Sequence, residues 1–179
     1  MWRSILKASV LSLVLATVLQ ADEASSAKAS KHPRFEQLKQ LAGTWVEADA
    51  QGQPTEKVVS VIQVTAGGSA VKETLFPGEE MEMISMYHLD GNDLVMTHYC
   101  MLGNQPRMKA DPQSPANQIR WQFAGGSNLD PSKDMHMHSS TLTFVDANHI
   151  QIEGEAWDGG KPCAEHCGQM KLVRQPASK

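Results

Sequence analysis

The chain has 179 residues, of which 41% are hydrophobic and 20% charged, and its formal net charge at pH 7 is −4. This acidic balance, with no run of five or more basic residues, excludes nucleic acid as an expected partner because its phosphates would be repelled. The length suits one domain with a sizeable core.

The first 21 residues have the pattern of a cleaved export signal. Arg3 and Lys7 precede the apolar run 10–19, and Ala21 offers a small residue for cleavage. The apolar run is shorter than the roughly 20 residues that a membrane-spanning helix needs. We therefore predict a signal peptide at 1–21 and an exported protein, either periplasmic or extracellular.

The segment after the predicted signal divides into a leader and one domain. Residues 22–32 combine alanine, serine and charge, which predicts a flexible leader, and residues 33–176 form the predicted domain. With the signal removed, 14 basic residues face 20 acidic ones, a net charge near −6. No later segment is apolar enough to cross a membrane, so we expect no integral membrane segment in the exported chain.

The domain opens with one predicted helix and continues with strands. Residues 32–43 carry apolar side chains at three-residue spacing between an early proline and a final glycine, which predicts a short helix. Beyond it the apolar period becomes two, and Gly, Pro, Asn and Asp clusters separate the strands. The candidate strands are 44–48, 57–64, 69–76, 80–89, 93–101, 118–124, 135–145, 149–157 and 169–174. Sequential short strands without a second helix predict an antiparallel sheet that closes into a barrel or forms a sandwich.

The two ends of the domain resemble a known family of barrels. The stretch "LAGTW" (41–45) places Gly43, Thr44 and Trp45 directly after the helix, and Arg174 lies in the last strand. This arrangement resembles lipocalin-like (calycin) barrels, in which a first-strand Trp closes the floor and an Arg lies across it. The resemblance implies an all-β antiparallel barrel of about eight to nine strands with one short N-terminal helix. The run 87–108 also resembles segments of exported bacterial proteins, which implies no activity.

Alternation in the hairpin 80–101 predicts which side chains face the interior. A two-residue turn at Gly91 places odd positions of the first strand beside even positions of the second. One face then lacks carboxylates and is the more apolar, so it should face inward. Its members are Met81, Met83, Ser85, Tyr87, Leu89, Leu94, Met96, His98 and Cys100.

Alternation also predicts the orientation of the side chains in "MHMH" (135–138). Leu142 and Phe144 set the inward parity, which brings His136 and His138 with them and turns the two methionines away. A bulge in this strand would overturn the assignment. Trp121, from strand 118–124, is also expected in the interior.

These side chains predict a ligand cavity. We expect a small apolar or amphipathic molecule to bind among Met83, Tyr87, Met96, His98, Trp121 and His138. In the loop "LGNQPRM" (102–108), Arg107 and neighbouring amides could select a carboxylate or phosphate end of that molecule. Alternatively, this loop is a plain turn and Arg107 is merely solvated. A third possibility is a barrel filled by side chains, acting as a structural or interaction protein of the cell envelope.

Metal or haem binding is the alternative hypothesis for the interior. His98, His136 and His138 could supply imidazoles to zinc, copper or haem iron, with Cys100 as a softer ligand. The leading hypothesis requires no cofactor.

For catalysis, Cys100 and His98 lie two apart on one strand, where side chains point in parallel, and the sequence contains no G-x-S-x-G or H-E-x-x-H motif. We therefore assign no catalytic residue.

The motif "CAEHC" (163–167) is expected in the loop between the last two strands. In an oxidising compartment, Cys163 and Cys167 would form a small disulfide-closed loop. The alternatives are a chelating loop that uses His166, or a disulfide from Cys100 to one of the two loop cysteines. The protein partner, if one exists, is not indicated by the sequence.

Overall fold

The computed structural model describes residues 32–176, except for the side chains of residues 166 and 167. The predicted signal peptide 1–21 and all but the last residue of the leader 22–32 lie outside the described residues. The elements are α1 (Pro33–Gln40), β1 (Gly43–Ala48), β2 (Pro54–Thr65), the 3-10 turn η1 (Ala66–Gly68), β3 (Ala70–Leu75), β4 (Met83–Asp90), β5 (Asp93–Tyr99), β6 (Gln105–Ala110), β7 (Gln118–Ser127), β8 (His136–Phe144), β9 (His149–Asp158) and β10 (Lys161–Arg174).

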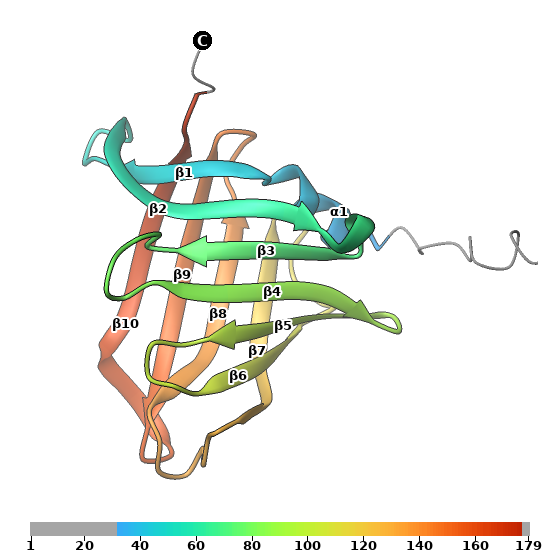
Figure 1. The fold of residues 1–179 in the computed structure, drawn as a ribbon, viewed down its shortest axis with the longest axis vertical. Coiled ribbons are helices and arrows are strands. Elements are labelled where there is room, and N and C mark those ends of the chain that lie inside the picture. Colours follow the sequence, from blue (N-terminus) through green and yellow to red (C-terminus); the bar gives the residue numbers. More distant parts are fainter. Residues whose placement is uncertain (1–31, 177–179) are drawn as a thin grey trace, which may run out of the picture. The chain divides into compact units, whose positions relative to one another are not determined.

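The ten strands form one closed antiparallel barrel. Each strand pairs with its neighbours in sequence, and β1 pairs with β10 to complete the ring, so the sheet has no free edge. In Figure 1, β1 to β5 run across the view and β7 to β10 cross behind them at a steep angle. The predicted all-β antiparallel barrel with one short helix is confirmed.

The strand count is ten rather than eight or nine, because one strand was mistaken for a loop. Residues 105–110 form β6, which pairs with β5 and β7. Pro106 made this segment resemble a turn, since proline cannot donate to a sheet ladder. It is tolerated beside a register shift between Pro106 and Met108. Similarly, β10 begins at Lys161, so "CAEHC" lies within a strand, where the register shifts between Cys163 and Gly168.

One end of the barrel is closed by the contact expected from the resemblance. Trp45 is completely buried, and its indole N–H donates to the Leu41 carbonyl at 2.8 Å. The Arg174 guanidinium lies 4.4 Å from the centre of the Trp45 ring and donates to the Ala42 carbonyl at 2.7 Å. Gly43 has a φ of 139°, and a Cβ there would lie 2.8 Å from an Arg174 nitrogen. The floor therefore requires glycine, tryptophan and arginine together.

Helix α1 covers the same end of the barrel. Its N-terminus is capped by His32, whose Nδ1 accepts from the Phe35 N–H, and Pro33 occupies the first turn. Phe35 and Leu38 are buried in the barrel core. On the other side of the helix, the Arg34 guanidinium donates to the Ser114 carbonyl at 2.7 Å, in the β6–β7 connection. The helix is thus held by the core on one side and by the β6–β7 connection on the other.

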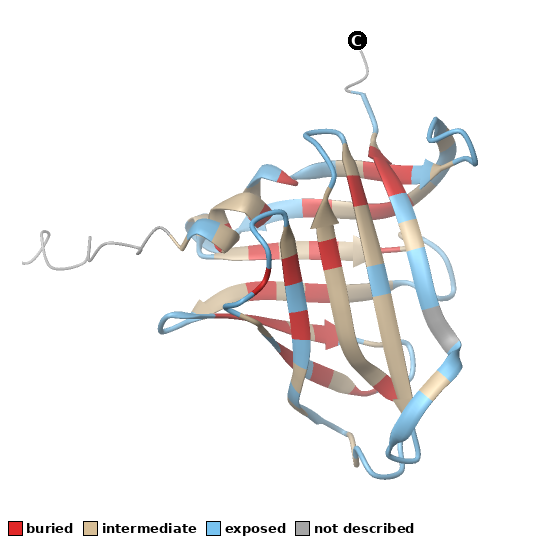
Figure 2. Cartoon of the chain, turned by 180° about the vertical axis from the view of Figure 1, so that it is seen from behind, coloured by how far each residue is buried: buried red, intermediate tan, exposed pale blue. Residues whose placement is uncertain are grey.

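Side chains alternate between the interior and the solvent along most strands. Figure 2 shows buried positions at every second residue along parts of several strands, as in β6 and β7. The buried core is largely apolar and extends from the floor toward the middle of the barrel. The inward parity predicted for β4 and β5 is confirmed by the burial of Ser85, Tyr87, Met96 and His98.

Candidate functional site

The barrel contains a large apolar cavity of about 640 Å³. Leu38 and Leu41 lie at its floor, and exposed residues of the β3–β4 and β5–β6 loops lie at its other end. The cavity therefore reaches solvent at the end opposite α1. Of the residues proposed from the sequence to hold a ligand, five line it: Met83, Tyr87, Met96, His98 and Trp121.

Methionines are concentrated on the wall and rim of the cavity. Met81 and Met101 are 40% and 58% exposed and also line the cavity, together with the half-exposed Leu102. Further methionines complete the lining at positions 83, 96, 135, 137 and 170. Methionine is unbranched and polarizable, so such a wall can adapt to ligands of different outline.

A buried carboxylate interrupts this apolar lining. Glu73, on β3, is only 4% exposed and lines the cavity. Its two oxygens accept hydrogen bonds from Ser60 Oγ at 2.7 Å and from the Tyr87 hydroxyl. Burial raises the pKa of Glu73, and the two donors oppose that rise only in part. Burial, and then the nearby Glu73 charge, raise the pKa of Tyr87 well above its usual value.

The polar groups continue across the neighbouring strands at the same level of the barrel. Glu73 is opposite Ser85 in the β3–β4 register, and Ser85 is opposite His98 in the β4–β5 register. Ser85 Oγ and His98 Nδ1 are 3.0 Å apart. Burial lowers the pKa of His98 to about 4, so its imidazole is neutral at physiological pH. We call Ser60, Glu73, Ser85, Tyr87 and His98 the polar row.

A bulge in β8 changes the expected orientation of the histidines. The β8–β9 register shifts between Met137 and Ser139, so His138 is the extra residue. As a result Met135 and Met137 line the cavity, contrary to the simple alternation expected from the sequence. His138 does not line it, although the completely buried His136 reaches its edge.

His138 is instead part of an aromatic cluster. Its ring stacks on Trp157, with centroids 3.7 Å apart and planes within 10°, and on Phe123 at 5.1 Å. His136 Nδ1 is 2.8 Å from the Asp134 carbonyl, which can only accept, so this nitrogen carries the proton. In neutral His136, Nε2 then accepts from His138 Nδ1 at 3.1 Å. Burial, and then the neighbouring His136, lower the pKa of His138.

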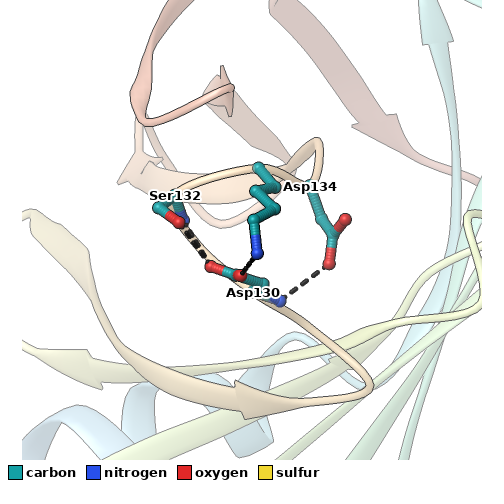
Figure 3. Close-up of polar contacts among 4 residues, drawn as sticks. Asp130, Ser132 and Asp134 are labelled. Atoms are coloured by element: carbon teal, nitrogen blue, oxygen red, sulfur yellow. Dashed lines mark hydrogen bonds and ion pairs between the residues drawn. The ribbon is translucent and has the colours of Figure 1, made fainter.

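The loop between β7 and β8 is held by its own side chains (Figure 3). The Asp130 carboxylate accepts from the Ser132 backbone N–H at 3.0 Å and from Lys133 Nζ at 2.7 Å. Asp134 Oδ2 accepts from the Asp130 N–H at 2.7 Å. The hydrogen bonds from the side chain of Lys133, and then from the side chain and backbone of Ser132, lower the pKa of Asp130 to about 2. Met135, which directly follows this loop, lines the cavity.

The polar residues predicted at the cavity mouth have other partners. Arg107 lies on β6, is exposed and forms an ion pair of 2.7 Å with Asp90, so it does not line the cavity. Asn104 is buried, and its Nδ2 donates to the Met135 carbonyl at 2.8 Å. It therefore joins the β5–β6 turn to β8. Gln105 accepts a hydrogen bond from Asn128.

The predicted metal ligands do not converge. Within residues 32–176, setting aside the undescribed side chains 166 and 167, no group of three or more His, Cys, Asp or Glu side chains could hold a metal ion. Cys100 is half-buried at the cavity wall and carries a free thiol. The Cys163–Cys167 disulfide and the role of His166 remain predictions, since two of these side chains lie outside the description.

Glu73 and Ser60 were missed from the sequence. The available signal was alternation in "AVKETL" (70–75), where Glu73 has the same parity as the buried Val71 and Leu75. A carboxylate at an inward position is uncommon, because burying a charge is unfavourable unless it is paired.

Comparisons with known proteins add no functional information for this chain. Neither the models of known protein families nor the curated proteins include a match. Among the described residues, no helix has both the length and the apolar character needed to cross a membrane.

Proposed function

We propose that this chain is an exported carrier that holds one small, largely apolar molecule inside its barrel, in the manner of lipocalin-like proteins. The observation that carries the proposal is the cavity of about 640 Å³, whose lining is largely apolar and includes Glu73, Ser85, Tyr87 and His98 of the polar row. Its volume lies within the range of about 300–1,000 Å³ that is typical of small-molecule sites. The N-terminal sequence pattern supports export, and the contact between Trp45 and Arg174 supports the lipocalin-like relationship.

The size of the cavity favours a carrier over a filled barrel. Protein interiors are packed as densely as organic crystals, and voids larger than a water molecule are few. An apolar void offers water few partners, whereas an apolar ligand would gain about 25 cal/mol for each Å² removed from water. A molecule that fills this space would therefore bind mainly through its apolar body.

Metal or haem binding, the second hypothesis from the sequence, has less support. His98 is next to Ser85, whereas His136 and His138 bond to each other. The three imidazoles would have to break these contacts and converge before they could share an ion.

The proposal can be tested with a probe and a blocking substitution. The neutral hydrocarbon diphenylhexatriene, which fluoresces when it leaves water, is titrated into the protein. Gly154 lies on the cavity wall, and a Cβ added there meets no atom within 4 Å, so Gly154→Phe can extend into the cavity. We expect this variant to weaken probe binding at least tenfold while the protein stays folded.

The matched control is Gln122→Phe, which adds the same ring at an exposed position of β7. This variant should bind the probe as tightly as the wild-type protein. Equal loss of binding in both variants, or no saturable binding in the wild-type protein, would contradict the proposal.

A further inference from the structure

The charged groups around the cavity are all acidic. Glu73 lines it from β3, and Glu155 lines it from β9. Among the described residues, no lysine or arginine lines the cavity. Arg107 is bonded to Asp90 outside the barrel, and Arg174 is bonded to backbone carbonyls beneath the floor. An acidic ligand would therefore meet a carboxylate without a cation beside it.

Glu73 has hydrogen-bond donors but no charged partner. Ser60 and Tyr87 each donate one hydrogen bond, one to each carboxylate oxygen. A carboxylate oxygen has about two acceptor positions, so each retains capacity for one more donor. Because Glu73 lines the cavity, a ligand that occupies the space lies within reach of this capacity.

The histidine of the polar row does not supply the missing positive charge. His98 is buried in the polar row, where burial favours its neutral form. Both ring nitrogens of His136 already have partners, the Asp134 carbonyl and His138 Nδ1. The polar-row residues around Glu73 can therefore donate hydrogen bonds but do not neutralise it.

We infer that the cavity selects a protonated amine on an apolar body, with the ammonium group at Glu73 and the apolar part along the methionine-lined wall. This inference rests on the proposed carrier function and specifies its ligand class. Burying an ion pair is unfavourable unless additional hydrogen bonds support it. Ser60 and Tyr87 provide that support here, since both donate to the carboxylate in advance of the ligand.

The inference reverses the ligand polarity expected from the sequence. Arg107 was predicted to attract a carboxylate or phosphate, but it lies on the outer surface. The group that faces the ligand is an acid. A fatty acid should therefore bind worse than the amine of equal chain length, and the uncharged alcohol should fall between them.

Competition against bound diphenylhexatriene tests this order at pH 7. Decylamine, decanol and decanoic acid share a ten-carbon chain and differ in their polar end. We expect decylamine to displace the probe at least tenfold more tightly than decanol, with decanoic acid weakest. This ranking uses the wild-type protein, so it does not depend on any variant folding.

Glu73→Gln then removes the charge while keeping the shape of the side chain. The preference of this variant for decylamine over decanol should fall at least tenfold, whereas Glu56→Gln, an exposed change on β2, should leave it unchanged. Decanoic acid binding as tightly as decylamine, or an unchanged preference in Glu73→Gln, would overturn the amine inference. Failure of the probe itself to bind would instead overturn the carrier function.

Discussion

The two ends of the barrel are built from different chemistry. At the α1 end, Trp45, Arg174 and Gly43 form a floor in which the ring, the guanidinium and the backbone carbonyls are all in contact. At the other end, Met81 and Met101 are exposed and border the cavity. The difference indicates that stability is concentrated at the floor, while the rim is free to accommodate a ligand.

The largest expected effect comes from opening the floor. Trp45→Ala removes a completely buried ring and leaves Arg174 without its stacking partner. Truncating a buried aromatic residue costs about 3–5 kcal/mol of unfolding free energy. Urea unfolding measures this loss. Tyr99→Ala, which removes an exposed ring from β5, should change stability by no more than ~0.5 kcal/mol. Similar losses in the two variants would contradict a floor that dominates stability.

A substitution in the polar row should have an intermediate effect on stability, and this effect depends on pH. The folded-state pKa of His98 is lowered to about 4, so the unfolded chain binds a proton first as the pH falls. The contribution of neutral His98 is complete above about pH 6.5 and is lost as the pH falls toward 4, by at most ~3 kcal/mol. His98→Gln should therefore flatten the decline in stability over this range.

The control for this prediction is His88→Gln, which changes a half-buried histidine of β4 that lies outside the polar row. Its stability should decline between pH 6.5 and 4 as in the wild-type protein. A decline in His98→Gln as steep as that of the wild type would show that His98 does not titrate as its burial implies.

The smallest effect is expected at the rim. Met101→Gln replaces an exposed thioether that borders the cavity, so it should weaken diphenylhexatriene binding a few-fold and change stability by less than ~0.5 kcal/mol. Val145→Gln, an exposed change in the β8–β9 loop at the α1 end, should affect neither quantity. If both substitutions weakened binding equally, the rim would have no special role.

The sequence predicted the floor and one wall well, because these parts follow simple rules. Alternation placed Tyr87, Met96 and His98 correctly, and the G-x-W pattern anticipated the contact with Arg174. These features depend on local period and on one pair of residues. They are therefore visible without knowledge of the remaining strands.

The missed features depend on exceptions to those rules. Pro106 made β6 look like a turn in the sequence. The proline fits the strand because the β6–β7 register shifts beside it. Glu73 is tolerated inside because Ser60 and Tyr87 come to it from two other strands. Alternation would have detected Glu73 as an inward carboxylate, but its partners depend on the three-dimensional register.

The bulge at His138 has a consequence for the chemistry of the cavity wall. It offsets the two halves of β8, so that sulfur from Met135 and Met137 faces the cavity. In a regular strand, His138 would share the inward parity of Ser140 and Leu142, and Met137 would face outward. Removing the bulge would therefore replace the Met137 thioether with the His138 imidazole on this part of the wall.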